Sequence, residues 1–158
     1  MLNKSVLQEK LKEFIHNNES QSDFSKRRIH YNSTINITNG LLRTWDKSKF
    51  EEYEKNLLTY FSLIKDQEFP LEKGQSIYNY HEFLLPVGRY LISKMNFISK
   101  ANLKVAIIFG LFLDILFYFL STKFEFLYFP LFTLILTIIF FYKQRLAIKE
   151  ERMFSIFW

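Results

Sequence analysis

The chain of 158 residues contains no cysteine, only four glycines and only three prolines. The lack of cysteine excludes disulfides, thiolate metal sites and cysteine nucleophiles. The four glycines lie too far apart to share one loop, so the chain lacks the glycine-rich turn that cradles phosphate groups. We therefore expect no metal site and no bound cofactor. These glycines are Gly40, Gly74, Gly88 and Gly110.

Histidine is nearly as scarce, with three residues in the chain. His81 precedes Glu82, but no second histidine follows at the spacing that a zinc-binding helix requires. Tyr80, His81 and Glu82 form a possible acid–base group, although such residues are far more common as ordinary surface positions. We expect no catalytic residues and no enzymatic activity. A membrane-anchored enzyme that uses His81 is the weakest of three functional alternatives.

The chain is rich in long apolar runs near its carboxyl end. Residues 105–120 contain one charged side chain, Asp114, and residues 127–142 contain none. Both runs approach the ~20 residues that a bilayer-spanning helix requires. The sequence therefore predicts a transmembrane helical hairpin over residues 105–142. A buried hairpin in a soluble protein is the alternative, but the chain has little other apolar surface to cover two helices that are apolar all round.

The remaining sequence predicts a mainly α-helical protein with four parts. Residues 1–85 form a soluble, mainly helical domain, and residues 86–104 form an amphipathic segment beside the membrane. The transmembrane hairpin follows, and residues 143–158 form a tail. No apolar run precedes residue 105, so we expect no secretory leader.

Within the soluble part, apolar spacing predicts helices over residues 4–16 and 48–65, the second opened by a capping box of Ser48 and Glu51. Residues 17–23 are predicted to form a loop. Residues 29–45 alternate in character around Asn39-Gly40, which favours a short β-hairpin. A helix broken at Gly40 is the competing interpretation.

A further helix is expected to begin near Ile77 and to be kinked or restarted at Pro86. After Pro86, apolar residues lie on one stripe and basic residues on others. Two interpretations remain open here: a helix resting on the membrane surface, or one packed on the soluble core. The apolar end of the tail is expected to dock on the soluble domain, return to the membrane interface or contact a partner. We expect the interface, because Trp158 suits that depth.

Basic residues predict the orientation of the hairpin, because Lys and Arg near span ends are retained on the cytoplasmic side. They flank both outer ends, whereas the connecting segment has only Lys123 beside Glu125. We expect a two-pass protein with both termini in the cytoplasm or its organellar equivalent. The bias toward Phe, Ile, Asn and Lys is typical of an AT-rich genome, which suggests a bacterial or organellar inner membrane. The expected membrane-surface anchors are Arg89, Lys94, Lys100, Lys104, Lys143, Arg145 and Trp158.

The formal net charge is +5 and the isoelectric point is near 9.3. We expect no nucleic-acid partner, because only Lys26, Arg27 and Arg28 are clustered and no nucleic-acid-binding motif accompanies them. An anionic lipid bilayer is the expected partner of these charges.

Asp114 is the main candidate for a functional residue, because a carboxylate in the middle of a span is costly unless it is paired, protonated or hydrated. In an antiparallel hairpin with its turn near residues 123–124, Asp114 lies level with Thr133 and Gly110 level with Thr137. Gly110 would permit close approach, and the Thr133 hydroxyl would bond a protonated Asp114. Structural pairing is the favoured interpretation. Contact with another membrane protein, or with further copies around a pore, is the alternative.

Three function classes follow from these features. The first is a non-catalytic interaction protein: a subunit of a membrane complex, or an immunity or regulatory protein, that binds through its hairpin and soluble domain. The second is an effector that oligomerises and perturbs the bilayer. The third is the membrane-anchored enzyme. A membrane-protein partner or a homo-oligomer is expected for the first two.

Overall fold

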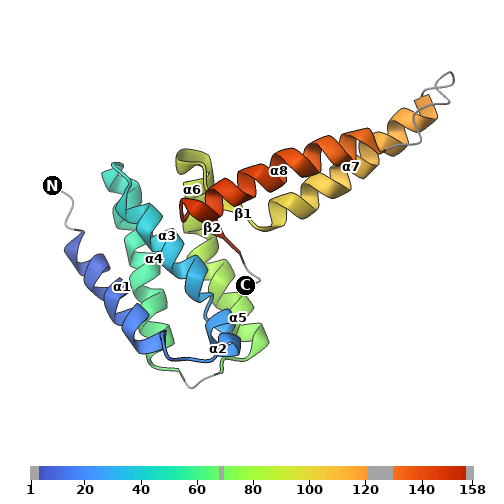
Figure 1. Ribbon diagram of the computed structural model, residues 1–158. Helices are drawn as coiled ribbons and strands as arrows, with labels where there is room; N and C mark the ends of the chain where they lie inside the picture. Colours follow the sequence, from blue (N-terminus) through green and yellow to red (C-terminus); the bar gives the residue numbers. More distant parts are fainter. Residues whose placement is uncertain (1–3, 68–69, 121–129, 156–158) are drawn as a thin grey trace. The chain divides into compact units, whose positions relative to one another are not determined.

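The computed structural model describes residues 4–67, 70–120 and 130–155 (Figure 1). The chain divides into two compact units. The helical unit comprises the described residues up to Phe97 together with Phe154 and Ser155. The hairpin unit comprises Ile98–Met153. The mainly α-helical fold class is confirmed, with two long apolar helices following a helical domain.

The helical unit is a bundle of short and medium helices. Its elements are α1 (Ser5–Asn18), α2 (Asp23–Arg28), α3 (Tyr31–Leu42), α4 (Lys47–Lys65), α5 (Lys73–Asn79), the π-helical turn η1 (Tyr80–Leu84) and α6 (Leu85–Met95). Leu7 and Leu11 of α1 and Leu57 and Ile64 of α4 enter the core at helical spacing. The predictions of a helix at 4–16 and of one ending at Lys65 are therefore confirmed. Helix α1 extends over the first two residues of the predicted loop, and α2 begins at its last residue.

The predicted β-hairpin at residues 29–45 is wrong, because most of this segment forms α3. Ile37 and Leu41 are fully buried one helical turn apart, so the burial follows the helical period. The hydroxyl of Thr38 donates to the carbonyl of Thr34 (2.7 Å), which satisfies a buried polar group within the helix. Gly40 does not break the helix. Its missing side chain makes room for Phe97, whose ring would lie 2.5 Å from a Cβ at this position.

The start of α4 also differs from the predicted capping box. The N-cap residue is Asp46, whose carboxylate accepts a hydrogen bond from the Lys49 amide (3.1 Å). Ser48 already lies inside the helix.

Pro86 lies in the first turn of α6, where its missing N–H group is tolerated. The turn η1 directly precedes α6. At the end of η1, the Leu85 amide donates a hydrogen bond to the carbonyl of Tyr80. Helix α6 then packs on the core of the helical unit, since Val87 and Leu91 are fully buried. Of the two interpretations of segment 86–104, core packing therefore holds for this face of α6.

The end of the described chain docks on the helical unit. Phe154 is buried in its core, beside Gly88, where a Cβ would lie 2.7 Å from the Phe154 ring. Ser33 and Ser155 exchange two hydrogen bonds: the Ser33 hydroxyl donates to the Ser155 carbonyl (2.8 Å), and the Ser155 amide donates to the Ser33 hydroxyl (2.9 Å). For these residues the preferred membrane-interface placement of the tail is wrong. Residues 156–158, including Trp158, lie outside the described residues.

The hairpin unit contains α7 (Ala101–Leu120) and α8 (Leu131–Lys149). Strands β1 (Ile98–Ser99) and β2 (Met153–Phe154) form a two-stranded sheet. Helix α7 begins before the predicted residue 105, and α8 runs past the predicted residue 142. Pro130 is the N-cap of α8. The predicted turn at residues 123–124 and the start of the second run at 127 lie outside the described residues.

Helix α8 ends in a Schellman motif that reverses the chain toward β2. Glu151 adopts the left-handed conformation (φ 54°), its amide bonds to the Ile148 carbonyl, and the Arg152 amide bonds to the Ala147 carbonyl. The Ile98 amide then donates a hydrogen bond to the Arg152 carbonyl (2.9 Å), which pairs β1 with the returning chain.

Candidate functional site

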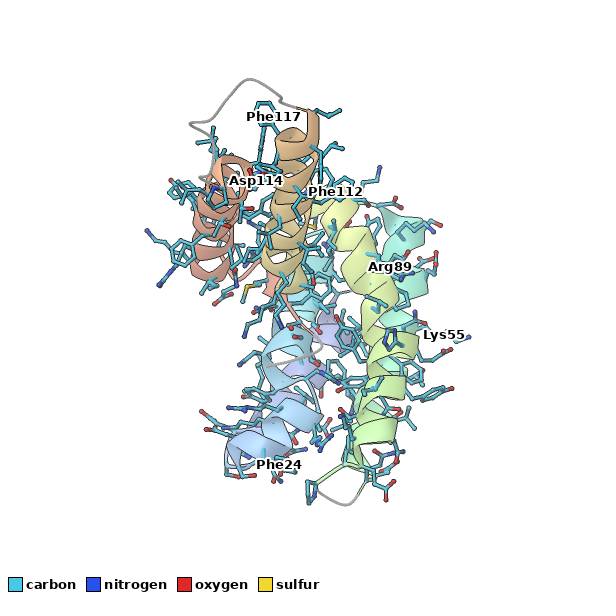
Figure 2. All side chains as sticks on the ribbon, turned by 90° about the vertical axis from the view of Figure 1, so that its right-hand side faces the viewer. Phe24, Lys55, Arg89, Phe112, Asp114 and Phe117 are labelled. Carbon is cyan, nitrogen blue, oxygen red and sulfur yellow. The ribbon has the colours of Figure 1, made fainter. Side chains whose placement is uncertain are left out.

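Helices α7 and α8 are long and apolar enough to cross a membrane, with mean hydropathies of 2.3 and 1.6. Only 11% of the apolar stretch of α7 and 6% of that of α8 are buried, so neither is the covered core helix of a soluble protein. Large apolar side chains are exposed on both helices, for example Phe112 on α7 (Figure 2) and Ile138 on α8. The hairpin unit thus presents apolar surface to its surroundings along two helices.

One side of each helix faces the other. On α7 this side carries Ala106 and Gly110, both buried, and on α8 it carries the half-buried Thr133 and Thr137. A Cβ on Gly110 would lie 2.6 Å from the Cα of Thr133, so the two backbones meet at this point. Small residues at such a contact allow membrane helices to pack closely.

Asp114, which is labelled in Figure 2, accepts three hydrogen bonds from the first turn of α8. The Phe132 amide donates to Oδ1 (2.8 Å), and the Thr133 amide and hydroxyl donate to Oδ2 (2.9 and 2.6 Å). Both carboxyl oxygens act as acceptors, so these bonds do not need the proton that the sequence-based pairing invoked.

This contact is a helix cap supplied by another helix. The first N–H groups of an α-helix have no partner within the helix, and Pro130 has no side-chain oxygen to offer them. The carboxylate of Asp114 supplies the acceptors and places negative charge at the positive end of the α8 dipole. Asp114 and Thr133 are thus in direct contact, and Asp114 is hydrogen-bonded within its own hairpin.

The cap lies at a depth where water is scarce if the basic end of α8 marks a membrane surface. From Leu131 to Tyr142 the helix has 12 residues, which rise ~18 Å before Lys143. A hydrocarbon core is about 30 Å thick, so the first turn of α8 would lie inside it. Unsatisfied amides cost several kcal/mol there.

Gly110 differs from its expected pairing with Thr137. The three atoms closest to a Cβ on Gly110 all belong to Thr133, one helical turn before Thr137. Thr133 therefore meets both Asp114 and Gly110, whereas Thr137 lies half-buried further along α8.

We expect Gly110→Ala to push α7 and α8 apart. The added methyl meets backbone rather than a movable side chain, at a cost of about 1–3 kcal/mol, which exceeds the gain of up to ~1 kcal/mol from helix propensity. Spin labels on cysteines at Phe109 and Ile138, both exposed, would report a longer distance between the helices. Gly74→Ala is the control, because nothing lies within 4 Å of its Cβ. An unchanged distance in Gly110→Ala would contradict the contact.

The predicted anchors lie on exposed positions where the structure describes them. Arg89 and Lys94 are exposed on α6, and Lys100 and Lys104 lie just before and within α7. On α8 the Lys143 ammonium lies 5.6 Å from the Phe140 ring. The Arg145 guanidinium lies 5.1 Å from the Phe141 ring. Such stacking lets a basic side chain lie along apolar surface while its charge stays in water.

The helical unit carries an open groove of about 710 Å³ between α1 and α4. Its floor is apolar, formed by Phe14, Leu58 and Phe61, and its rim is charged. At the rim, Glu13 bonds to Lys10 (2.7 Å) and Lys65 (2.9 Å). Hydrogen bonds from Lys10 and then Lys65 lower the pKa of Glu13 to about 2, so the rim stays ion-paired at neutral pH. Sequence reasoning missed this groove, because nothing local indicates that α1 and α4 are neighbours.

Within the possible acid–base group, the rings of Tyr80 and His81 meet edge to face, with centroids 5.8 Å apart. Tyr80 is buried and its ring packs 4.9 Å from that of His30, whereas His81 and Glu82 are exposed. No cluster of three or more metal-ligating His, Asp or Glu side chains occurs in the part of the chain that the structure describes.

In comparisons with known proteins, the chain matches no family model, no curated protein and no solved structure. The fold and the two apolar helices define its class: a helical domain joined to a helical hairpin that is long and apolar enough for a membrane.

Proposed function

We propose that this protein is a two-pass integral membrane protein that acts as a non-catalytic interaction protein. The observation that carries the proposal is the exposed apolar surface of α7 and α8, which needs lipid or another membrane protein around it. The charges support a bilayer, because basic residues flank both outer ends of the hairpin. The helical unit and both termini then face the cytoplasm or its organellar equivalent.

The hydrogen bonds of Asp114 within its own hairpin bear on where a partner protein would bind. Because its carboxylate caps α8, it is not offered outward as a polar contact for another membrane protein. The remaining candidates are the outer faces of the hairpin and the groove between α1 and α4. The groove suits a segment of a partner protein, since it combines an apolar floor with a charged rim. In this account the protein is a subunit or regulator of a membrane complex.

Site-specific photo-cross-linking in cells would test the interaction role. We expect a cross-linker at Val6, on the groove, or at Ile138, on the outer face of α8, to yield one discrete protein adduct. Lys55, exposed on α4 away from the groove lining, is the matched control and should yield none. Adducts of equal intensity from all three positions, or from none, would contradict the proposal.

A second candidate function is an oligomerising effector that perturbs the bilayer. One observation favours it: the outer faces of α7 and α8 are apolar and exposed, and further copies of the hairpin packed side by side would cover them. Release of a trapped dye from vesicles by the purified protein would support this function, and intact vesicles would count against it.

A further inference from the structure

Trp45 is the most exposed large apolar side chain among the described residues of the helical unit, at 93% exposure. It occupies the position just before the N-cap of α4, where an apolar side chain commonly folds back onto the fourth helical residue. That residue is Phe50, which is buried at 1% exposure, yet Trp45 points outward instead of covering it. Its exposure therefore lacks the usual packing explanation.

The turn that carries Trp45 is held firmly. Lys4 donates two hydrogen bonds to its backbone, to the carbonyls of Leu42 (2.6 Å) and Thr44 (2.8 Å). The Lys4 ammonium also lies 5.7 Å from the Trp45 ring. The hydroxyl of Thr44 bonds to that of Tyr90 on α6 (2.8 Å). Trp45 is thus an exposed ring on a fixed turn, which lowers the entropy lost on binding.

This turn lies at the end of the helical unit from which the chain leaves for α7. Gly40, near the end of α3, packs against Phe97, and Tyr90 ties the turn to α6. Figure 1 shows the turn between α3 and α4 at the same end of the helical unit as the end of α6, away from α2 and α5. From Phe97 to the start of α7 at Ala101, four residues span at most ~14 Å.

The charge of the turn is mainly positive. Arg43 and Lys47 flank Trp45, and Lys4 lies beneath it. The one acidic residue in the turn is Asp46, whose carboxylate caps α4. Lys47 also faces Glu51 at 3.8 Å, in an exposed pair of little energetic weight. An exposed Trp among basic residues is typical of a surface that binds the interface of an anionic membrane.

We propose that the turn at residues 43–47 docks on the surface of an anionic lipid bilayer, with Trp45 inserted at headgroup depth. The proposal rests on the proposed function, because α7 enters the bilayer there and follows this end of the helical unit after a short segment of chain. Its effect is to attach the helical unit to the membrane surface at a second point.

Tryptophan fluorescence of the full chain in vesicles tests the proposal. The chain has two tryptophans, so Trp158→Phe leaves Trp45 as the only one. In vesicles of phosphatidylcholine and phosphatidylglycerol, lipids brominated near the glycerol should quench Trp45 several-fold more than in vesicles without phosphatidylglycerol. Arg43→Glu with Lys47→Glu should remove most of this quenching. As a matched control, Tyr78→Trp in a chain with Trp45→Phe and Trp158→Phe should not be quenched, although Tyr78 is 62% exposed.

A third probe separates this proposal from the proposed function. Phe112→Trp in the chain without the other tryptophans lies on the outside of α7 and should be quenched by bromines deep in the acyl chains. Quenching of Phe112→Trp but not of Trp45, or equal quenching of Trp45 and Tyr78→Trp, would overturn the docking surface alone. Loss of quenching at Phe112→Trp would overturn the membrane span itself, and docking with it.

Discussion

Phe154→Ala is expected to destabilise the helical unit by about 3–5 kcal/mol, because it empties a buried aromatic site. The Phe154 ring lies in the core beside Gly88, whose missing side chain makes room for it. The space cannot collapse easily, since the neighbouring backbone of α6 is held by Val87 and Leu91 in the same core. The last described residues are therefore part of the folded unit rather than an appendage.

Urea unfolding in mild detergent, followed by far-UV circular dichroism, would measure this loss, because the apolar helices resist urea in the micelle. Phe24→Ala removes a ring of the same size that is 54% exposed and should shift the midpoint far less. If Phe154→Ala and Phe24→Ala had equal midpoints, the docking of the chain end would be refuted.

Asp114→Leu is the second large effect, and it acts on the hairpin unit. The substitution favours insertion of α7 into lipid but leaves the amides of Phe132 and Thr133 without their acceptors. Each orphaned group costs about 1–3 kcal/mol. We expect hydrogen exchange of these two amides, measured in detergent, to accelerate by roughly tenfold or more, since 1.4 kcal/mol corresponds to a factor of ten.

Two variants make this measurement specific. Asp114→Asn keeps one carbonyl oxygen and should give an intermediate exchange rate. Thr137→Val changes the same side of α8 one turn later and should leave both amides slow. Fast exchange in Thr137→Val, or slow exchange in Asp114→Leu, would show that the cap does not protect the start of α8.

The sequence predicted the elements whose pattern extends over several turns. Helix α4 repeats buried apolar residues at helical spacing, and α7 and α8 come from runs that are apolar on all sides. The contact between Asp114 and Thr133 was also within reach, since only a polar partner relieves a carboxylate in an apolar helix.

Other features depend on tertiary contacts that no local pattern encodes. The alternation near Ile35 and Ile37 suggested a strand, but burial of α3 on several sides, beside Phe97 and Ser155, favours the helix. The docking of Ser155 on Ser33 joins residues 122 positions apart. The apolar tail was predicted to lie at the membrane interface. An apolar segment fits lipid and a protein core alike, because both environments exclude water.

Cysteine labelling in intact cells tests the central claim, a two-pass hairpin with the helical unit inside, most directly. The chain has no cysteine of its own, so a single introduced thiol gives no background. A membrane-impermeant reagent should label Thr122→Cys, between the two spans, from outside. It should label Ser48→Cys, exposed on α4, only after the cells are permeabilised. Labelling of Ser48→Cys in intact cells, or protection of Thr122→Cys, would contradict the account.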